Sequence, residues 1–327
     1  MRIGFIGGSG HHYLKALADD RANQIAIAGD GVDDHATAEF AATIAGAKSF
    51  DSAERMLDTF KPDVVSVGAV HAHNGDFAAM SLERNIPTVS DKPVAANWPQ
   101  YDRLTKLCEN NNRKLITEFD FRSRQEFRSA REAVRAGLLG EIVLITGQKS
   151  YKWGKRPKWY ASREHYPSTL MWIACHAIDA MIFVGAVKLI SVIAHQGNVT
   201  RPEIGRAEDH AAAMYELGNG GVGVVHADYL RPAKAATHGD DRLRVVGARG
   251  VLEVRDNRCL LITETQAEQD ITARTPPIAA HDALLAAALG KEQDLYSTQH
   301  SLEMARILLK TRDAADCGGR VWLNKKD

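Results

Sequence analysis

Short apolar runs alternate with amphipathic stretches from the start of the chain to residue 120. The apolar runs predict strands at 2–6, 24–28, 63–67, 88–90 and 114–117. Between them, the helical spacing of apolar positions predicts helices, among them 35–44, 77–84 and 98–110. Regular alternation of strands and helices is typical of a parallel sheet whose strands are joined by right-handed crossovers. We therefore expect an α/β domain built on one parallel sheet.

The pattern changes after residue 120. A predicted helix at 125–136 ends at Gly137. Longer strands with alternating apolar and polar positions follow, at 141–147, 189–195, 209–217, 222–229, 242–246, 251–254 and 260–263. Glycine-rich turns such as 218–221 join consecutive strands, which favours a mostly antiparallel sheet. Further helices are expected at 282–289 and 298–315. We predict two domains, residues 1–120 and residues 121–327.

Composition narrows the class of protein. The 327 residues are enough for two domains with cores of their own. Lysine plus arginine and aspartate plus glutamate number 41 each, so no overall charge draws the chain to nucleic acid or to an anionic membrane. No apolar run approaches the roughly 20 residues of a membrane span, and the first residues are too short and glycine-broken for a secretion signal. The four cysteines form no CxxC pair. We expect a cytoplasmic protein with reduced thiols.

A glycine-rich turn follows the first predicted strand. The sequence Gly7-Gly8-Ser9-Gly10-His11-His12 resembles the GxGxxG turn of a Rossmann domain, although serine and histidine stand at two glycine positions. Backbone N–H groups of such a turn bind a pyrophosphate at the start of a helix. Asp30, at the end of the next strand, has the spacing of a ribose-binding carboxylate and would repel a 2′-phosphate. The turn therefore predicts NAD as the cofactor. The alternative is an ordinary glycine turn with a solvated Asp30.

Two further segments lie where parallel strands deliver residues to a ligand. Ala69, His71 and Asn74 follow the predicted strand at 63–67, and Asp91 and Lys92 follow the one at 88–90. We predict cofactor contacts for all five. The spacing of His71 and His73 would allow a metal, but no third ligand is evident, so no metal is expected. Pro93 restricts the backbone of Lys92, which favours a functional lysine over a surface lysine at a strand end.

With these segments in place, the chain resembles the Gfo/Idh/MocA family of nicotinamide-dependent sugar oxidoreductases along almost its whole length. The likeness rests on the glycine turn, Asp30, Asp91-Lys92-Pro93 (usually Glu-Lys-Pro), residues 118–124, VRAGLLGEI at 134–142, LRVVGARG at 243–250 and the closing VWL at 321–323. The resemblance implies a Rossmann domain joined to an α+β domain with a large, mostly antiparallel open sheet. It also implies that this sheet forms a homodimer or homotetramer.

A second family signature, Asp-x-Gly-x-His-x-x-Asp, corresponds to residues 172–179. His176 matches the catalytic histidine and Asp179 the second carboxylate, whereas Trp172 stands where many members carry an aspartate. By helical spacing, 172, 176 and 179 share one face. The resemblance implies Lys92 and His176 as the acid/base groups. It also places Asp179 among the substrate-binding residues, where it would orient the imidazole, and Trp172, which would offer a face to a sugar ring. The alternatives are a core histidine for His176 and a helix-end pair for Asp179.

A basic, aromatic segment at 149–160 lies between the two signatures. In the family this region overhangs the substrate, so Tyr151 and Trp153 are candidates for stacking on a sugar, and its cations could pair with an acidic group. A solvated loop or a subunit contact is the alternative. Arg122 is a further candidate for substrate contact, as is Arg124.

These residues predict an NAD-dependent oxidoreductase that acts on a hydroxyl of a sugar, sugar acid, cyclitol or glycoside. The substituted signature at Trp172 leaves open an NAD-retaining hydrolase or lyase that cleaves a glycoside through transient oxidation. A non-catalytic sugar-binding homologue is a third reading.

Overall fold

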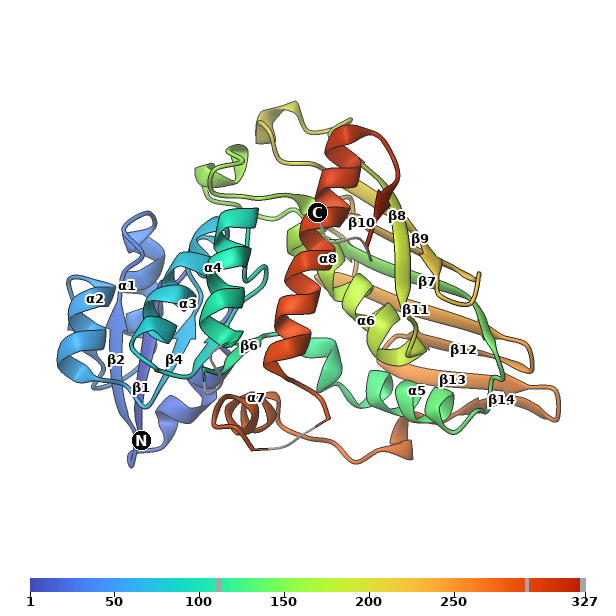
Figure 1. Ribbon diagram of the computed structural model, residues 1–327, viewed down its shortest axis with the longest axis horizontal. Coiled ribbons are helices and arrows are strands. Elements are labelled where there is room, and N and C mark those ends of the chain that lie inside the picture. Colours follow the sequence, from blue (N-terminus) through green and yellow to red (C-terminus); the bar gives the residue numbers. More distant parts are fainter. Residues whose placement is uncertain (110–112, 292–293, 324–327) are drawn as a thin grey trace. The chain divides into compact units, whose positions relative to one another are not determined.

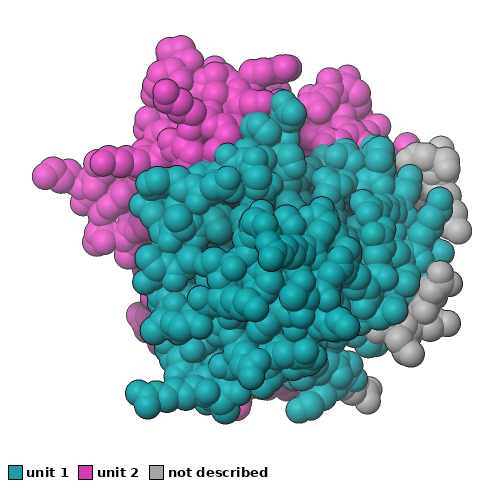
Figure 2. All heavy atoms as spheres, turned by 90° about the vertical axis from the view of Figure 1, so that its left-hand side faces the viewer, with its two compact units in different colours: residues 1–118, 164–167, 279–309 teal, residues 119–163, 168–278, 310–327 magenta. Residues whose placement is uncertain are grey.

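The computed structural model describes residues 1–109, 113–291 and 294–323, and it divides into two compact units. The first unit comprises residues 1–118, 164–167 and 279–309, and the second comprises residues 119–163, 168–278 and 310–327. Figure 2 distinguishes the two units by colour. The sequence-based division at 120 differs from this arrangement in two segments. Residues 164–167 and 279–309 fall within the predicted second domain but pack with the first unit.

The first unit is built on a six-stranded, fully parallel sheet in the order β3-β2-β1-β4-β5-β6 (Figure 1). Its strands are β1 (Arg2–Ile6), β2 (Gln24–Ala28), β3 (Lys48–Phe50), β4 (Val64–Val67), β5 (Thr88–Ser90) and β6 (Leu115–Thr117). Its helices are α1 (Asp34–Ala42), α2 (Ala53–Arg55), α3 (Asn74–Glu83) and α4 (Trp98–Glu109). The parallel α/β domain predicted from the sequence is confirmed. The asparagines at 110–112, where we expected α4 to end, lie outside the described residues.

Alternate residues of the short strands enter two hydrophobic clusters. On β1, Ile3 and Phe5 belong to one cluster and Ile6 to the other, as the period of two in a strand requires. The first cluster also contains Leu284 and Ala288 of α7 (Ala280–Ala288). A sequence-ordered division could not anticipate this, because the apolar face of α7 completes a core that begins almost 300 residues earlier in the chain.

The second unit contains a nine-stranded sheet in the order β14-β13-β12-β11-β7-β10-β9-β8-β15. All its pairs are antiparallel except that of β7 with β10. The strands are β7 (Ile142–Tyr151), β8 (Leu189–Gly197), β9 (His210–Leu217), β10 (Val222–Asp228), β11 (Gly239–Gly247), β12 (Gly250–Arg255), β13 (Arg258–Thr263), β14 (Gln266–Asp270) and β15 (Val321–Trp322). This confirms the predicted large, mostly antiparallel sheet.

One face of this sheet is covered by helices. Along β9, Ala211, Ala213, Tyr215 and Leu217 are buried, and the residues between them are more exposed. Figure 1 shows α5 (Gln125–Arg135) and α6 (Cys175–Gly185) against the covered face. A long helix, α8 (Thr298–Cys317), belongs to the first unit up to residue 309 and to the second from residue 310. No helix in the described part of the chain is long and apolar enough to cross a membrane.

Candidate active site

Lys92 lies directly after β5, at the carboxyl end of the parallel sheet, and is 2% exposed. The backbone on each side of it is held. The Asp91 N–H donates to Val67 O at 2.8 Å, and the Asn74 side-chain amide donates to Asp91 O at 3.3 Å and to Pro93 O at 3.4 Å. The Lys92–Pro93 peptide bond is cis. The position of the Lys92 backbone is therefore fixed by its neighbours on β4 and α3.

The Asp91 carboxylate connects this segment to the glycine turn. It accepts hydrogen bonds from the backbone N–H groups of His11 and Lys92, both at 2.8 Å, and is fully buried. A Cβ on Gly10 would lie 2.6 Å from Asp91 Oδ2, so only glycine allows this approach. Burial by itself would raise the pKa of Asp91, but the charges of Lys92, His11 and His71 outweigh it and hold the pKa well below its usual value. Asp91 is thus an ionised anchor for the turn.

The glycine turn is compact because backbone crowds it on two sides. Gly7 has a φ of +80°, and a Cβ there would come within 2.5 Å of Ala69 Cα. A Cβ on Gly8 would lie 2.4 Å from Ala36 O at the start of α1. The helix we expected after the turn is a short 3₁₀ helix, η1 (Tyr13–Asp19). The turn therefore lacks the long helix that usually follows it in a dinucleotide-binding domain.

The turn nevertheless has donors for a phosphate group. The Gly10 and His11 N–H groups are taken by Gly68 O and Asp91. Among the described residues, the N–H groups of Gly8, Ser9 and His12 donate to no protein acceptor. Uncommitted N–H groups on a glycine turn after the first strand suit a pyrophosphate. The residues present fit a dinucleotide.

His12 stands at one glycine position of the motif and acts as a packing residue. Its ring lies 5.2 Å from that of Phe5 and 4.5 Å from that of Phe40. Its Nδ1 is 2.7 Å from Ser66 Oγ on β4, and its Nε2 is 3.2 Å from Gly7 O in the turn. The imidazole therefore connects the glycine turn to β4. Burial lowers the pKa of His12 to about 4. The side chain is neutral at pH 7 and serves the cofactor turn through its shape.

The stability of the protein is expected to fall as the pH drops from about 6.5 to about 4. In this window the unfolded chain carries a proton on His12 and the folded chain does not, so acid favours unfolding, by about 3 kcal/mol at the lower end. Urea unfolding at a series of pH values measures this slope. In the matched variant His12→Gln, the free energy of unfolding should change less with pH over the same window. An unchanged slope in that variant would rule out His12 as its source.

Asp30 lies at the end of β2, as predicted, but its carboxylate points to the backbone. Oδ1 accepts from the N–H groups of Val32 at 3.0 Å and Asp33 at 2.9 Å, and Oδ2 accepts from Val70 N at 2.6 Å. The side chain is not the solvated carboxylate of the alternative reading, because the residue is 8% exposed. A carboxylate offers about four acceptor positions, so the described contacts leave one, on Oδ2, for a hydroxyl.

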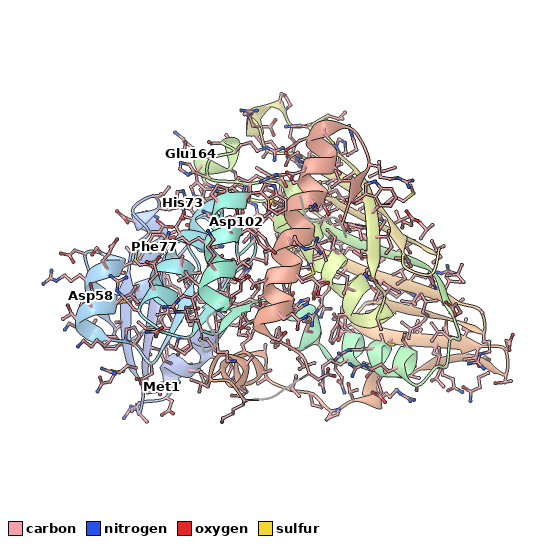
Figure 3. The ribbon with its side chains drawn as sticks, viewed as in Figure 1. Met1, Asp58, His73, Phe77, Asp102 and Glu164 are labelled. Atoms are coloured by element: carbon pink, nitrogen blue, oxygen red, sulfur yellow. The ribbon has the colours of Figure 1, made fainter. Side chains whose placement is uncertain are left out.

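Of the predicted cofactor residues after β4, Asn74 and His71 make different contacts. Asn74 is fully buried, and its side-chain oxygen accepts from Ala69 N at 3.1 Å, so its amide group holds this turn to the Lys92 segment. His71 is 1% exposed, with its ring 6.3 Å from that of Tyr166. His73, labelled in Figure 3, lies 3.0 Å from His165 between ring nitrogens. The segment 164–167 thus packs on the turn after β4.

In the second unit, His176 lies in the first turn of α6 and is 5% exposed. Its Nδ1 is 2.9 Å from Oδ1 of Asp120, which belongs to the turn η4 (Asp120–Arg122). The rings of Phe119 and Phe121 lie 6.2 and 5.4 Å from the imidazole. From the sequence, Asp179 was expected to orient this ring. The structure instead places the carboxylate of Asp120 against it.

Asp179 and Arg122 form a buried ion pair. Arg122 donates through Nε and Nη2 to the Asp179 carboxylate, at 2.8 to 3.1 Å, and its guanidinium lies 4.7 Å from the Phe183 ring centroid. Asp179 is fully buried and Arg122 is 6% exposed. Both were predicted to contact substrate. Because their charged groups satisfy each other, the geometry supports a role in holding η4 to α6 instead.

A network of charges extends from Asp120 into the sheet. Lys149 on β7 lies 2.9 Å from Asp241 Oδ1, and Arg124 lies 2.9 Å from Asp241 Oδ2. Burial by itself would raise the pKa of Asp120, but His176, Lys149 and Arg124 outweigh it and hold the pKa well below its usual value. Asp120 is therefore ionised at neutral pH.

The remaining substrate candidates lie in aromatic surroundings. Trp172 is 5% exposed and belongs to a π-helical turn, η6 (Leu170–Ala174), which is wider than the α-helical spacing that placed it on the face of His176. Trp153 packs edge-on against Tyr229, with ring centroids 4.9 Å apart, and the Arg156 guanidinium lies 5.3 Å from the Tyr229 ring. The ring of Tyr151 lies 4.9 Å from that of His238, and burial raises the pKa of Tyr151.

Comparison with known proteins agrees with this architecture in both units. The oxidoreductase family with an NAD-binding Rossmann fold matches residues 1–119, and the Gfo/Idh/MocA C-terminal domain matches residues 127–253. A structure of a putative oxidoreductase from Thermotoga maritima is 30% identical, with a TM-score of 0.91 over 98% of this chain and 100% of the other. The chain belongs to the Gfo/Idh/MocA family. The resemblance inferred from the sequence is confirmed, and the family's N-terminal domain binds NAD.

Other relatives are more distant. A D-glucoside 3-dehydrogenase from Escherichia coli (strain K12) is 27% identical over 192 residues, which is 54% of each protein. The match thus spans about half the length of this curated relative. An inositol dehydrogenase homologue from Azotobacter vinelandii, solved with NAD⁺, is 19% identical, with a TM-score of 0.80 over 98% of this chain and 96% of the other. At that identity the likeness concerns the fold alone.

Sequence reasoning missed Asp120 and the network behind it. Asp120 follows the last strand of the parallel sheet closely, in the segment that supplied Arg122 and Arg124 as candidates. That position was the available signal, since the ends of parallel strands deliver residues to ligands. No cluster of three metal-ligating side chains occurs in the part of the chain that the structure describes.

Proposed function

We propose that this member of the Gfo/Idh/MocA family is an NAD-dependent oxidoreductase that transfers hydride between nicotinamide and a hydroxyl of a sugar, sugar acid, cyclitol or glycoside. Lys92 carries the proposal. It is a buried lysine on an immobilised backbone at the carboxyl end of the parallel sheet, and its neighbour Asp91 binds the glycine turn. A lysine so placed is suited to proton transfer.

In this proposal Lys92 and His176 are the acid/base groups. When bound, NAD⁺ accepts the hydride from the carbon that carries the reacting hydroxyl. The chain must then remove the proton of that hydroxyl, which lysine and histidine can do once neutral. Asp91 holds the Lys92 segment, and Asp120 faces the His176 imidazole. Trp172 remains a candidate for contact with the sugar ring, as do Tyr151 and Trp153.

The first unit favours NAD over NADP. The open acceptor position on Asp30 Oδ2 can take a hydrogen bond from the ribose, and an ionised carboxylate repels a 2′-phosphate. The free N–H groups of Gly8, Ser9 and His12 supply donors for the pyrophosphate. The side chains of Asn74 and Asp91 would support the cofactor indirectly, by holding the turns together.

The second unit favours a neutral polyol over a sugar acid. Three of the five cations of the 149–160 segment, which were candidates for pairing with an acidic substrate, have protein partners. Lys149 binds Asp241, the Lys152 ammonium donates to Ala235 O, and Arg156 lies against aromatic rings. Pairing a substrate carboxylate with Lys149 or Lys152 would require breaking the contact that the lysine already makes. The name of the Escherichia coli relative, a glucoside dehydrogenase, agrees with a neutral sugar.

A direct test is NADH formation by the purified protein with a panel of neutral sugars, glycosides and cyclitols, alongside their uronic and aldonic acids. We expect NADH, measured by absorbance, with at least one neutral member and little with the acids. NADP⁺ in place of NAD⁺ is the matched control and should react poorly. Absence of NAD binding, or of turnover across the whole panel, would refute the proposal.

A further inference from the structure

The carboxylate that pairs with the His176 imidazole comes from outside the helix α6 that carries this histidine. Asp120 contributes the carboxylate that lies 2.9 Å from Nδ1, and it comes from η4, a turn that precedes His176 by more than fifty residues. The imidazole is almost completely buried, whereas the Asp120 side chain is 25% exposed. The Asp120 side chain is therefore the more exposed member of the pair.

Two cations, Lys149 and Arg124, favour the ionised form of Asp120. Lys149 and Arg124 are both fixed by the two oxygens of Asp241, each at 2.9 Å. The Lys149 ammonium also lies 4.2 Å from the centroid of the Phe121 ring, immediately after Asp120 in the chain. Their positive charges act on Asp120 together with that of His176 and outweigh the effect of burial, so the pKa of Asp120 lies well below its usual value.

We propose that Asp120 is a positioning residue for the reaction, which orients the His176 imidazole and favours its protonated form. The inference rests on the proposed function in that His176 is taken as an acid/base group. An ionised carboxylate 2.9 Å from Nδ1 favours, through its charge, the form of the ring that carries a proton on that nitrogen. It also stabilises the positive charge that develops when the ring accepts the proton.

The other charged groups of this region pair with one another. The turn η4 carries Asp120 and Arg122, and Arg122 is bound to Asp179 of α6 itself. The start of α5 carries Arg124 and Glu126, which pair with each other. Strands β7 and β11 contribute the remaining groups, Lys149, Tyr151 and Asp241. Among the described ion pairs, His176 is matched with Asp120.

The substitution Asp120→Asn keeps the size of the side chain and removes its charge. In the oxidation direction the ring must be neutral to accept a proton. Loss of the carboxylate makes it neutral at lower pH, so the acid limb of the kcat/KM profile should move about one unit towards acid. At the pH optimum kcat should fall about 10- to 100-fold, because the ring is no longer oriented, and the Kd for NAD⁺ should not change. Asp120→Glu should restore the wild-type limb.

The control variant is Asp179→Asn, which breaks the other carboxylate pair between η4 and α6. It should lower Tm and leave the acid limb at its wild-type position. Nuclear magnetic resonance titration of the His176 ring, in the intact protein without substrate, should show the same shift in Asp120→Asn and none in Asp179→Asn. If Asp120→Asn does not fold, Asp120→Ser provides the neutral replacement.

An unshifted His176 titration in the neutral variants, or an equal shift in Asp179→Asn, would overturn the proposal. The titration needs no turnover, so it tests the Asp120–His176 coupling independently of the proposed oxidoreductase function. A protein that oxidises no polyol but shows the His176 shift would refute the proposed function and retain the Asp120–His176 coupling. An active enzyme whose His176 titration does not shift would retain the proposed function and refute the Asp120–His176 coupling.

Discussion

Replacement of Lys92 by methionine is expected to lower kcat by about 10²- to 10⁴-fold, the range typical of a lost acid/base group. Methionine retains most of the volume of this buried side chain, which is 2% exposed, so the fold should survive. The hydrogen bonds of Asp91 and Asn74 that hold the segment use its backbone groups and do not involve the Lys92 side chain. We therefore expect the Kd for NAD⁺, measured by calorimetry, to change little while turnover measured by absorbance is lost.

The matched control is Lys92→Arg, which keeps the positive charge. Arginine is not deprotonated in proteins and cannot exchange a proton with substrate, so this variant should be as inactive as Lys92→Met. If Lys92→Arg retained most of the activity, charge rather than proton transfer would be the role of Lys92. A Lys92→Met enzyme with wild-type kcat would remove Lys92 from the chemistry altogether.

The largest expected effect on stability comes from breaking the Arg122–Asp179 pair. Arg122→Met should lower the free energy of unfolding by about 3–5 kcal/mol, because it leaves the fully buried Asp179 carboxylate without its partner. Chemical denaturation at pH 7 measures this difference. The Asp120–His176 contact involves neither residue of this pair, so the fraction of protein that remains folded should keep the wild-type acid limb.

A double variant separates lost charge pairing from lost packing. Arg122→Met combined with Asp179→Leu leaves no buried charge, and such replacements are often neutral or stabilising. We expect the double variant to recover most of the stability lost in Arg122→Met. A double variant as unstable as the single one would show that the two groups contribute through packing, and that their charges contribute little.

The main elements could be predicted from the sequence because their residues are buried in a regular pattern. The central strands of both sheets carry apolar side chains at every or every second position, and most of their predicted limits lie within a few residues of the observed ones. The exception is β7, which was expected to end at residue 147 and continues to Tyr151. The strands that were missed, β3, β14 and β15, lie at the edges of the sheets. All five residues of β14 are exposed, so backbone pairing with β13 defines this strand and no hydrophobic pattern reveals it.

For the candidate site, the positions of residues could be predicted from the sequence, but the directions and partners of their side chains could not. Lys92, Asp91 and the glycine turn could be located because strand ends in a parallel sheet lie at a common edge. The direction of a side chain could not be predicted, as Asp30 shows by turning its carboxylate to three backbone N–H groups. The partners of His176 and Asp179 depend on how η4 packs on α6, which local spacing does not encode.

This packing also bears on the rival hypothesis of a cleaving enzyme. That hypothesis drew on the tryptophan at 172, which removes a carboxylate from the signature helix. Asp120 supplies a carboxylate to His176 from another element, so the substitution at 172 does not deprive the imidazole of one. An ordinary dehydrogenase is thereby consistent with the residues present.

The central claim is net hydride transfer to NAD⁺, and isotopic labelling tests it most directly. A neutral sugar found active in the panel, carrying deuterium on the carbon that is oxidised, is incubated with the protein and NAD⁺, and both products are examined by mass spectrometry. The account predicts one deuterium in each NADH formed and an equal amount of oxidised sugar. Deuterium returned to a cleaved sugar, with no NADH accumulating, would contradict it.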